Sequence, residues 1–237
     1  MNYPIVVLAG GVATRLRPLT DTIPKSLVEV AGKPFAVHQI ELLQRNGIAD
    51  VTFLIGHLGE MIADTLGDGH RWGVRIHYVP DGPRALGTAG AVRNALPLIR
   101  DPFFVIYGDS YLDCDYAAVA RAFAASGRRG LMTVCRNAGK WDRSNVLYTA
   151  GRIARYDKLD RTVEMEHIDY GLGVFRHSAF AGVEPGEPRD LATVYQQLLA
   201  DGDLAGYEVP TRFYEVGSPE GLAETREYLA MKSAAAR

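Results

Sequence analysis

The chain contains few of the residues that mark disulfide-rich, metal-cluster or membrane proteins. Only two cysteines, Cys114 and Cys135, occur among its 237 residues, too few for a disulfide framework or a cysteine zinc site. No apolar run approaches the roughly 20 residues that span a bilayer, and no basic segment precedes the first apolar run. We therefore expect no signal peptide, no membrane partner and a cytoplasmic location. The net charge of −2 gives no basic field for nucleic acid, so we expect no nucleic-acid partner.

Two common phosphate-binding motifs are also absent. A P-loop needs four residues between its glycines and then Gly-Lys-Ser/Thr, and no segment of the chain has this pattern. The dinucleotide fingerprint G-x-G-x-x-G does not fit Gly10 to Arg15, which read Gly-Gly-Val-Ala-Thr-Arg. A plain NAD-binding protein is therefore only a distant alternative.

The pattern that is present alternates strands with helices. Apolar runs predict strands at 5–8, 51–55, 74–79 and 103–107, and helical spacing predicts helices at 35–45, 58–66 and 87–96. This alternation predicts an α/β fold with a Rossmann-like, doubly wound, mostly parallel sheet and helices on both faces. No repeat or linker-like segment interrupts the chain, so we expect a single domain over residues 1–237.

The pattern loosens in the second half of the chain. We expect a helix at 116–125 with Asp115 as its N-cap, a strand at 131–135, and a hairpin of 146–148 with 152–156. A strand at 168–175 and a helix at 191–199 capped by Asp190 follow, then short strands at 204–209 and 212–216. A final helix should cover 219–231, with 232–237 as a frayed tail. Asp113 is interpreted as a turn residue.

The most informative stretch runs from Leu8 to Pro34. A buried strand feeds the glycine pair Gly10-Gly11, which places bare backbone N–H groups at the carboxyl end of a sheet. Open α/β sheets bind their ligands there, and concavities of N–H groups suit anions. Arg15 and Lys25 add positive charge to the same long loop. The stretch therefore predicts a site for a phosphorylated ligand.

This stretch closely resembles the signature of the sugar-1-phosphate nucleotidyltransferases, G-G-x-x-T-R-L-x-P-L-T followed by P-K-x-L and G-K-P. The resemblance implies a nucleotide-diphospho-sugar transferase-like fold, with Arg15 and Lys25 as catalytic residues. It also implies that the nucleotide is bound by Leu8, Ala9, Gly10, Gly11 and Thr14. The matching positions are Gly10, Gly11, Thr14, Arg15, Leu16, Pro18, Leu19, Thr20, Pro24, Lys25, Leu27, Gly32, Lys33 and Pro34.

Small residues from Gly87 to Ala91 open a predicted helix. Small side chains let a ligand approach the backbone, and the helix dipole favours negative charge there. The segment resembles the family's L-G-T-A/G-x-A segment, which borders the nucleobase and ribose, so Gly87, Thr88 and Ala89 are expected to bind nucleotide. Thymidylyl members typically carry a G-L-A-Q pattern instead, which disfavours dTTP.

Two carboxylates are candidate metal ligands. Asp109 follows an apolar strand and Gly108, so its carboxylate should lie at the carboxyl edge of the sheet, where Mg2+ can bind oxygen ligands and substrate phosphates. The pair also matches the family's metal-binding Gly-Asp. Residues 213–219 resemble the family's W/F-x-D-x-G-T-P, whose aspartate is the second ligand. Glu215 stands in that place and reaches one carbon further.

A candidate acceptor site lies between these segments. Residues 155–158 follow the predicted hairpin and resemble the family's E-K-P, which implies that Lys158 holds the sugar phosphate and Asp157 hydrogen-bonds sugar hydroxyls. The chain has Asp157 for the glutamate and Leu159 for the proline. Asn145 lies where many members have a glycine beside the sugar. These departures indicate a sugar site unlike that of the common glucose enzymes.

The resemblance implies a reaction in which a sugar 1-phosphate attacks the α-phosphorus of a nucleoside triphosphate, giving an NDP-sugar and pyrophosphate. We expect Mg2+ as cofactor and GTP with D-glycero-D-manno-heptose or mannose 1-phosphate as substrates. UTP, CTP and alcohol phosphates stay open as alternatives, as does a homo-oligomeric state. A catalytically silent nucleotide-sugar-binding regulatory subunit is the alternative from another functional class.

Overall fold

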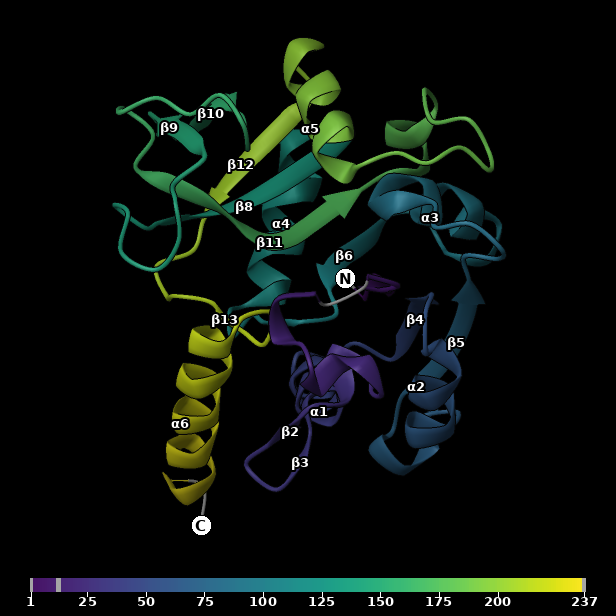
Figure 1. Ribbon diagram of the computed structural model, residues 1–237. Coiled ribbons are helices and arrows are strands. Elements are labelled where there is room, and N and C mark those ends of the chain that lie inside the picture. The colour runs from purple at the N-terminus through teal and green to yellow at the C-terminus, as the bar shows by residue number, and fades with distance from the viewer. Residues whose placement is uncertain (1, 12–13, 236–237) are drawn as a thin grey trace.

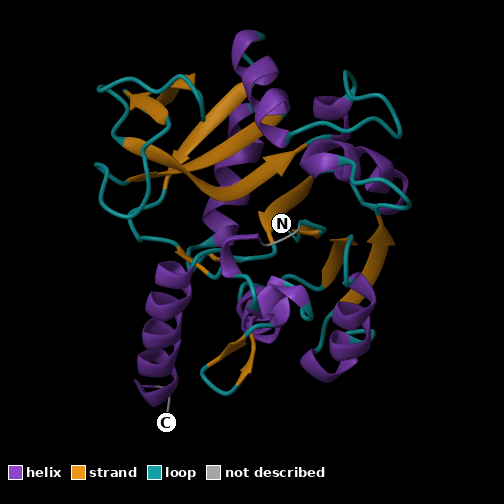
Figure 2. Cartoon of the chain, in the orientation of Figure 1, coloured by secondary structure: helices purple, strands orange, loops and turns teal. Residues whose placement is uncertain are grey.

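The computed structural model describes residues 2–11 and 14–235, and in this part of the chain nine strands form one sheet (Figures 1 and 2). Its main path is β10-β9-β11-β6-β1-β4-β5, with β8 joined to β11 and β12 joined to β8. The strands β6, β1, β4 and β5 are parallel, whereas β11 runs antiparallel to β6. The strands of this sheet are β1 (Ile5–Ala9), β4 (Asp50–Ile55), β5 (Arg75–Pro80), β6 (Phe103–Tyr107), β8 (Gly130–Arg136), β9 (Val146–Thr149), β10 (Arg152–Tyr156), β11 (His167–Phe175) and β12 (Leu204–Glu208).

Helices cover both faces of the sheet, as predicted. On β1, Ile5 and Val7 face a core shared with α1, α2 and α4, whereas Val6 and Leu8 face a core shared with α3 and α5. This alternation follows from the two-residue period of a strand and explains why β1 is apolar throughout. The helices are α1 (Phe35–Arg45), α2 (Gly59–Leu66), α3 (Gly87–Ala95), α4 (Tyr116–Ser126), α5 (Leu191–Ala200) and α6 (Pro219–Ala235).

Two small two-stranded sheets lie outside the main one. Strands β2 (Glu29–Val30) and β3 (Lys33–Pro34) pair within the signature stretch, and β7 (Ser110–Tyr111) pairs with β13 (Tyr214–Glu215). The second pair joins the chain just after β6 to the segment before α6. It thereby brings two segments about a hundred residues apart in sequence to the same edge of the main sheet.

The C-terminal region differs from the prediction in two respects. The strand expected at 212–216 is confined to Tyr214–Glu215, and α6 continues to Ala235, so residues 232–235 are helical rather than a frayed tail. Residues 236 and 237 lie outside the described part. The helix extends because the Lys232 ammonium and the Tyr228 hydroxyl both donate to the Asp113 carboxylate. Asp113 is therefore a docking residue for α6 and not only a turn residue.

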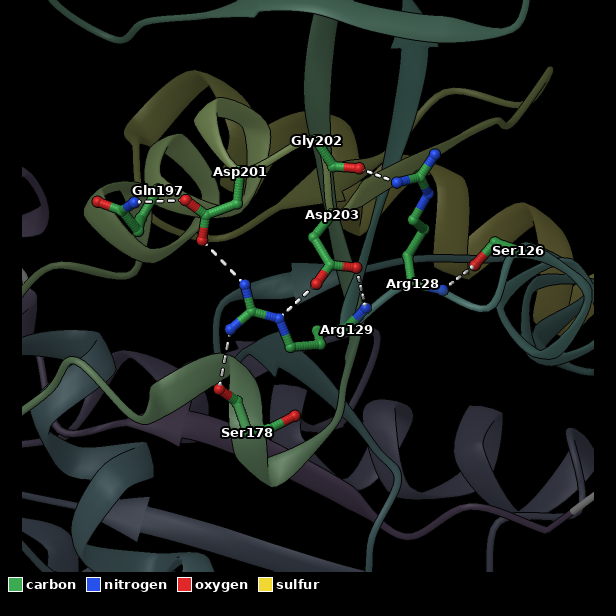
Figure 3. A network of polar contacts seen from close by, with 8 residues as sticks. All are labelled: Ser126, Arg128, Arg129, Ser178, Gln197, Asp201, Gly202 and Asp203. Carbon is green, nitrogen blue, oxygen red and sulfur yellow. Dashed lines mark hydrogen bonds and ion pairs between the residues drawn. The ribbon is translucent and has the colours of Figure 1, made fainter.

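Arg129, the residue before β8, links this strand to the segment that follows α5 (Figure 3). Its guanidinium contacts the carboxylates of Asp201 and Asp203, and its backbone N–H donates to Asp203 at 2.9 Å. Burial opposes ionisation of Asp203, but the hydrogen bonds from Arg129 outweigh it and lower the pKa of this carboxyl. This network ties the C-terminal end of α5 to the sheet and so fixes where the N-terminal end of α5 lies. Within the described ranges, none of the helices is both long and apolar enough to cross a bilayer.

Candidate active site

The carboxyl ends of β1, β4 and β5 meet around Gly10. A Cβ atom placed on Gly10 would lie 3.0 Å from Asp81 Oδ2 and 3.4 Å from the backbone nitrogen of Gly56. A larger residue at position 10 would therefore push apart three loops that line one hollow. This close approach explains why residue 10 is a glycine, whether or not a ligand binds there. It also leaves the edge of the sheet open beside Gly11. Residues 12 and 13 of the signature lie outside the described residues.

Cations and carboxylates predicted from distant segments converge at this edge. Lys25 Nζ lies 2.6 Å from Asp109 Oδ2, and both side chains are largely buried. A Cβ atom placed on Gly217 would lie 2.9 Å from Asp109 Oδ2, 2.8 Å from Glu215 Oε2 and 3.4 Å from Arg15 Nη2. The structure thus brings both predicted catalytic cations and both predicted metal ligands to one place.

Strand pairing explains how Glu215 reaches this place. Glu215 lies opposite Ser110 in the β7–β13 pair, and the N–H of Val216 donates to the carbonyl of Asp109 at 2.9 Å. Its carboxylate accepts hydrogen bonds from the N–H of Gly217 and the hydroxyl of Ser218. Glu215 therefore also organises the first turn of α6.

The donor set suits a hard divalent ion. Two carboxylates approach the same point, and such ions prefer oxygen ligands completed by substrate phosphates and water. In the described ranges, groups of three or more histidine, cysteine or acidic side chains that could enclose a metal by themselves do not occur. The chain could thus hold an ion through Asp109 and Glu215 together with a bound phosphate.

A cavity of about 210 Å³ lies directly beside the charged cluster. Five of the predicted nucleotide-binding residues do not behave alike: Leu8, Gly10 and Gly11 line it, whereas Ala9 is buried in the core and Thr14 is exposed outside it. From α3, Gly87 and Thr88 line the cavity, and the buried Ala89 does not. The remaining lining residues are Lys25, Leu54, Asp81, Ala85, Ala91 and Tyr107.

The first amides of α3 are already engaged by another loop. The N–H groups of Ala89 and Gly90 donate to the carbonyl of Arg189 at 2.9 and 3.3 Å. The hydroxyl of Thr88 accepts from the N–H of Leu191 at 2.7 Å. In this arrangement the small residues of α3 admit the loop before α5, and Gly87, Thr88 and Ala91 of the segment face the cavity.

Asp81 and Tyr107 are cavity residues that the sequence analysis did not select. Asp81 follows β5, and burial raises the pKa of its carboxyl, opposed by a hydrogen bond from the backbone of Leu86. Tyr107 is the last residue of β6, two residues before Asp109. Their position at the carboxyl ends of predicted parallel strands was the available signal, because all such ends share one edge.

The three predicted sugar-phosphate residues have different surroundings. Asn145 is buried, and its Oδ1 accepts from the backbone N–H of Asp169 at 2.9 Å. Asp157 Oδ1 accepts from the N–H groups of Leu159 and Asp160, which lower the pKa of this carboxyl, so it closes a turn.

Lys158 lies next to that turn, and its Nζ is 3.7 Å from Asp190 Oδ1. Asp190 in turn accepts a hydrogen bond from the N–H of Ala192 as the N-cap of α5. The ammonium and Asn145 both flank Asp169, a residue of β11 that the sequence analysis did not select.

Comparison with known proteins identifies the family of the chain. The family model described as nucleotidyl transferase matches residues 5–144, which includes the signature stretch and Asp109. N-acetylmuramate alpha-1-phosphate uridylyltransferase of Neisseria meningitidis is 30% identical over 229 residues, covering 93% of this chain and 96% of that protein. Mannose-1-phosphate guanyltransferase beta-B of Xenopus laevis is 27% identical over 221 residues, covering 91% of this chain and 61% of its own length.

Solved structures share the same fold. HddC from Yersinia pseudotuberculosis, solved with GMP-PN, superposes with a TM-score of 0.80 at 21% identity, covering 96% of this chain and 99% of that one. This likeness confirms the predicted fold class, a mostly parallel sheet with helices on both faces. From the family match over more than half of its length, the chain belongs to the nucleotidyl transferase family, among its sugar-1-phosphate nucleotidyltransferases.

Proposed function

We propose that the chain couples a sugar 1-phosphate to GTP, with D-glycero-D-manno-heptose or mannose 1-phosphate as acceptor, and releases pyrophosphate. The observation that carries the proposal is the convergence of Arg15, Lys25, Asp109 and Glu215 beside the 210 Å³ cavity. Such a site places positive charge beside two phosphorylated substrates and so reduces the repulsion between them, which their reaction requires. The 27% identity to a mannose-1-phosphate guanyltransferase supports the choice of GTP and mannose.

The chemistry needs little from the protein beyond positioning and charge stabilisation. The attacking phosphate oxygen is already ionised at neutral pH, because the second pKa of a phosphate monoester is about 6. No general base is therefore required, and catalysis rests on bringing two polyanions together in line. Backbone N–H groups near Gly10 and Gly11 would hold the triphosphate. Arg15 and Lys25 would neutralise the charge at the α-phosphoryl group and on the departing pyrophosphate, and Lys25 would help orient the acceptor.

Asp109 and Glu215 would hold Mg2+, with Lys158 on the phosphate of the acceptor. When bound, the ion supplies positive charge to the phosphate oxygens. In the structure Lys25 neutralises Asp109, so the ammonium has to leave that carboxylate for the phosphates when substrate binds. Asp109 is then free to accept a new cation.

The choice of nucleotide is the part of the proposal with a clear competitor. The 30% identical relative is named as a uridylyltransferase, which supports UTP as the alternative. Asp81 and Thr88 line the cavity; the Thr88 hydroxyl accepts from the N–H of Leu191 and keeps its own hydrogen to donate to the nucleotide. CTP and alcohol phosphates are further alternatives within the same reaction class.

We also propose that residues 1–237 act as one domain in the cytoplasm, on small molecules rather than on nucleic acid or membranes. The net charge of −2, the two cysteines and the lack of a linker-like segment support this. A homo-oligomer is compatible with all of these features.

Pyrophosphate release measured across GTP, UTP, CTP, ATP and dTTP, each with a panel of sugar 1-phosphates and Mg2+, tests the proposal. We expect turnover that depends on the divalent ion and is fastest with GTP and mannose or heptose 1-phosphate. Fastest turnover with UTP would replace the nucleotide assignment. Binding of an NDP-sugar without turnover in any combination would instead support a regulatory subunit.

A further inference from the structure

Asp169 is a carboxylate beside the proposed acceptor site that the proposed function leaves without a role. It lies on β11, where the strand breaks its pairing register with β8 between Asp169 and Gly173. Its Oδ1 accepts from the N–H of Gly171 at 3.0 Å, and its Oδ2 accepts from the hydroxyl of Tyr156 at 3.3 Å. Two fixed donors thus hold the carboxylate in one orientation and leave it further lone pairs.

The surroundings of Asp169 match those expected of an acceptor pocket. Its backbone N–H binds Asn145, and its carboxylate interacts electrostatically with Lys158 and Asp190. A Cβ atom placed on Gly171, whose N–H Asp169 binds, would lie 3.6 Å from Cδ2 of Tyr107, which lines the nucleotide cavity. Asp169 therefore neighbours both the cavity wall at Tyr107 and the two proposed acceptor residues, Asn145 and Lys158.

Asp169 also lacks a cationic partner. In the described part of the chain it forms no ion pair within 4 Å, and Lys158 lies nearer to Asp190. Burial raises the pKa of the Asp169 carboxyl, which the charge of Lys158 partly opposes. A half-buried carboxylate without an ion pair gains most from additional hydrogen-bond donors, because donors to a charged group are the strong ones.

The resemblance had assigned this role to Asp157. Its carboxylate instead receives two backbone N–H groups of its own turn and is open to solvent. Both residues donate a backbone N–H to Asn145, but of the two carboxylates that of Asp169 is the more enclosed.

We propose that Asp169 selects the acceptor by accepting hydrogen bonds from its hydroxyl or ammonium groups. The substrate class is therefore a neutral or amino-bearing phosphate ester, and acceptors that carry a carboxylate are disfavoured. Asp190 strengthens the exclusion, because its carboxylate is already paired with the Lys158 ammonium at 3.7 Å. Placing a further anion there brings like charges together without compensation. This inference rests on the proposed function.

Matched acceptor pairs provide the test. The two members of each pair differ by a carboxylate or a carboxylate-bearing group. The pairs are glucose 1-phosphate with glucuronate 1-phosphate, N-acetylglucosamine 1-phosphate with N-acetylmuramate 1-phosphate, and phosphoethanolamine with phosphoserine. We measure kcat/KM for both members of each pair that turns over, with the full-length chain and saturating nucleotide. We expect the neutral or amino member to be favoured by at least about tenfold, the smaller effect of losing one hydrogen bond to a charged group.

The variant Asp169→Asn separates the charge from the shape. Its amide oxygen still accepts from Gly171 and its amide nitrogen can donate to the Tyr156 oxygen, so the turn is retained. We expect KM for the favoured acceptors to rise about 10- to 100-fold, the preference within each pair to shrink, and KM for the nucleotide to stay unchanged. Asp160→Asn is the control, because it removes an exposed carboxylate paired with Arg155 on the neighbouring turn.

The outcomes are distinguishable. An unchanged preference in Asp169→Asn, a wild-type preference for acidic acceptors, or a shift produced by Asp157→Asn and not by Asp169→Asn would overturn the assignment while leaving the transferase reaction in place. Absence of pyrophosphate release from every acceptor would overturn the proposed function itself, and this assignment with it.

Discussion

Lys25 has two partners in the catalytic cycle that we propose, and the structure shows one of them. Its ammonium lies 2.6 Å from Asp109 Oδ2, with both side chains enclosed. The contact lowers the cost of holding a carboxylate at the sheet edge while no phosphate is present. The same ammonium is the group best placed to meet a triphosphate beside Gly11, whose Cβ position lies 3.9 Å from Nζ.

Replacing Lys25 should remove charge stabilisation in the transition state. For Lys25→Ala we expect kcat/KM to fall by an amount that corresponds to about 3 to 4 kcal/mol of lost transition-state stabilisation, comparable to the loss of an oxyanion donor. Pyrophosphate release under saturating Mg2+ measures the effect. Lys140→Ala, in an exposed turn, is the matched control and should retain wild-type rates. Near-normal turnover of Lys25→Ala would remove the residue from the catalytic set.

The same substitution should have the opposite effect on binding of a free metal ion. Without Lys25, Asp109 loses its ion-pair partner, so Mn2+ without nucleotide should bind more tightly to Lys25→Ala than to the wild type. Titration followed by the electron paramagnetic resonance of free Mn2+ measures this. Asp109→Asn combined with Lys25→Ala should abolish the gain. Equal affinities in wild type and Lys25→Ala would show that the ammonium does not compete for Asp109.

Glu215 combines two roles that substitutions can separate. Its carboxylate accepts from Gly217 and Ser218 at the start of α6, and it faces the point shared with Asp109. Glu215→Gln retains an acceptor oxygen but removes the charge, so we expect a melting temperature near wild type and a raised Mg2+ requirement. Glu215→Ala should lose both, with a lower melting temperature. If Glu215→Gln leaves the Mg2+ dependence of pyrophosphate release unchanged, the residue serves only α6.

Among the elements, helix starts were the most predictable features. Asp115 and Asp190 were expected as N-caps, and their carboxylates accept from the N–H groups of Ala118 and Ala192. Both follow from local chemistry, because the donor lies two or three residues beyond the acceptor. The apolar strands of the parallel half of the sheet could likewise be predicted from local sequence. The short strands β2, β3 and β7 were not predicted, because two-residue pairs carry no periodicity.

The α4 cap gives an element-scale prediction. Asp115→Ala should lower the free energy of unfolding by about 1 kcal/mol, which corresponds to roughly 2 to 4 °C in melting temperature for a chain of this size. Asp115→Asn should recover most of the loss, because asparagine caps as well as aspartate. Thermal denaturation followed by circular dichroism measures both variants. A loss in Asp115→Asn as large as in Asp115→Ala would indicate that the charge, and not the cap, stabilises α4.

At the scale of the whole molecule, the features that escaped prediction are those made by segments far apart in the chain. The proposed role of Asp169 depends on its contacts with Tyr156 and Asn145 and on the nearby charge of Lys158. The position of Asp81 at the cavity depends on the close approach of Gly10. Lys25 and Asp109 were predictable although 84 residues separate them, because each lies in a short continuous motif. Charge and burial at the acceptor side arise only once β10, β11 and α5 are packed together.

The position of α6 depends on another such contact, and acid should weaken it. Figure 1 shows α6 extending away from the main sheet, with its C-terminal end at the edge of the molecule. A small apolar cluster that includes Leu222, Leu229 and Tyr111 holds the helix, and Asp113 binds Tyr228 and Lys232 across it. Burial would raise the pKa of Asp113, but hydrogen bonds from Lys232 and Tyr228 outweigh it and lower this pKa below its usual 3.8.

A carboxyl whose pKa is lower in the folded state stabilises the fold above its unfolded pKa, and the contribution is lost as the pH falls through the folded pKa. We therefore expect the melting-temperature difference between wild type and Asp113→Asn to be constant from neutral pH to about 5 and to shrink as the pH falls below 3.8. The pair is about one-third exposed, so the difference should not exceed about 1 kcal/mol, or roughly 2 to 4 °C. Asp64→Asn, on the surface of α2, controls for net charge. A difference that persisted at low pH would mean that shape, and not ionisation, joins Asp113 to α6.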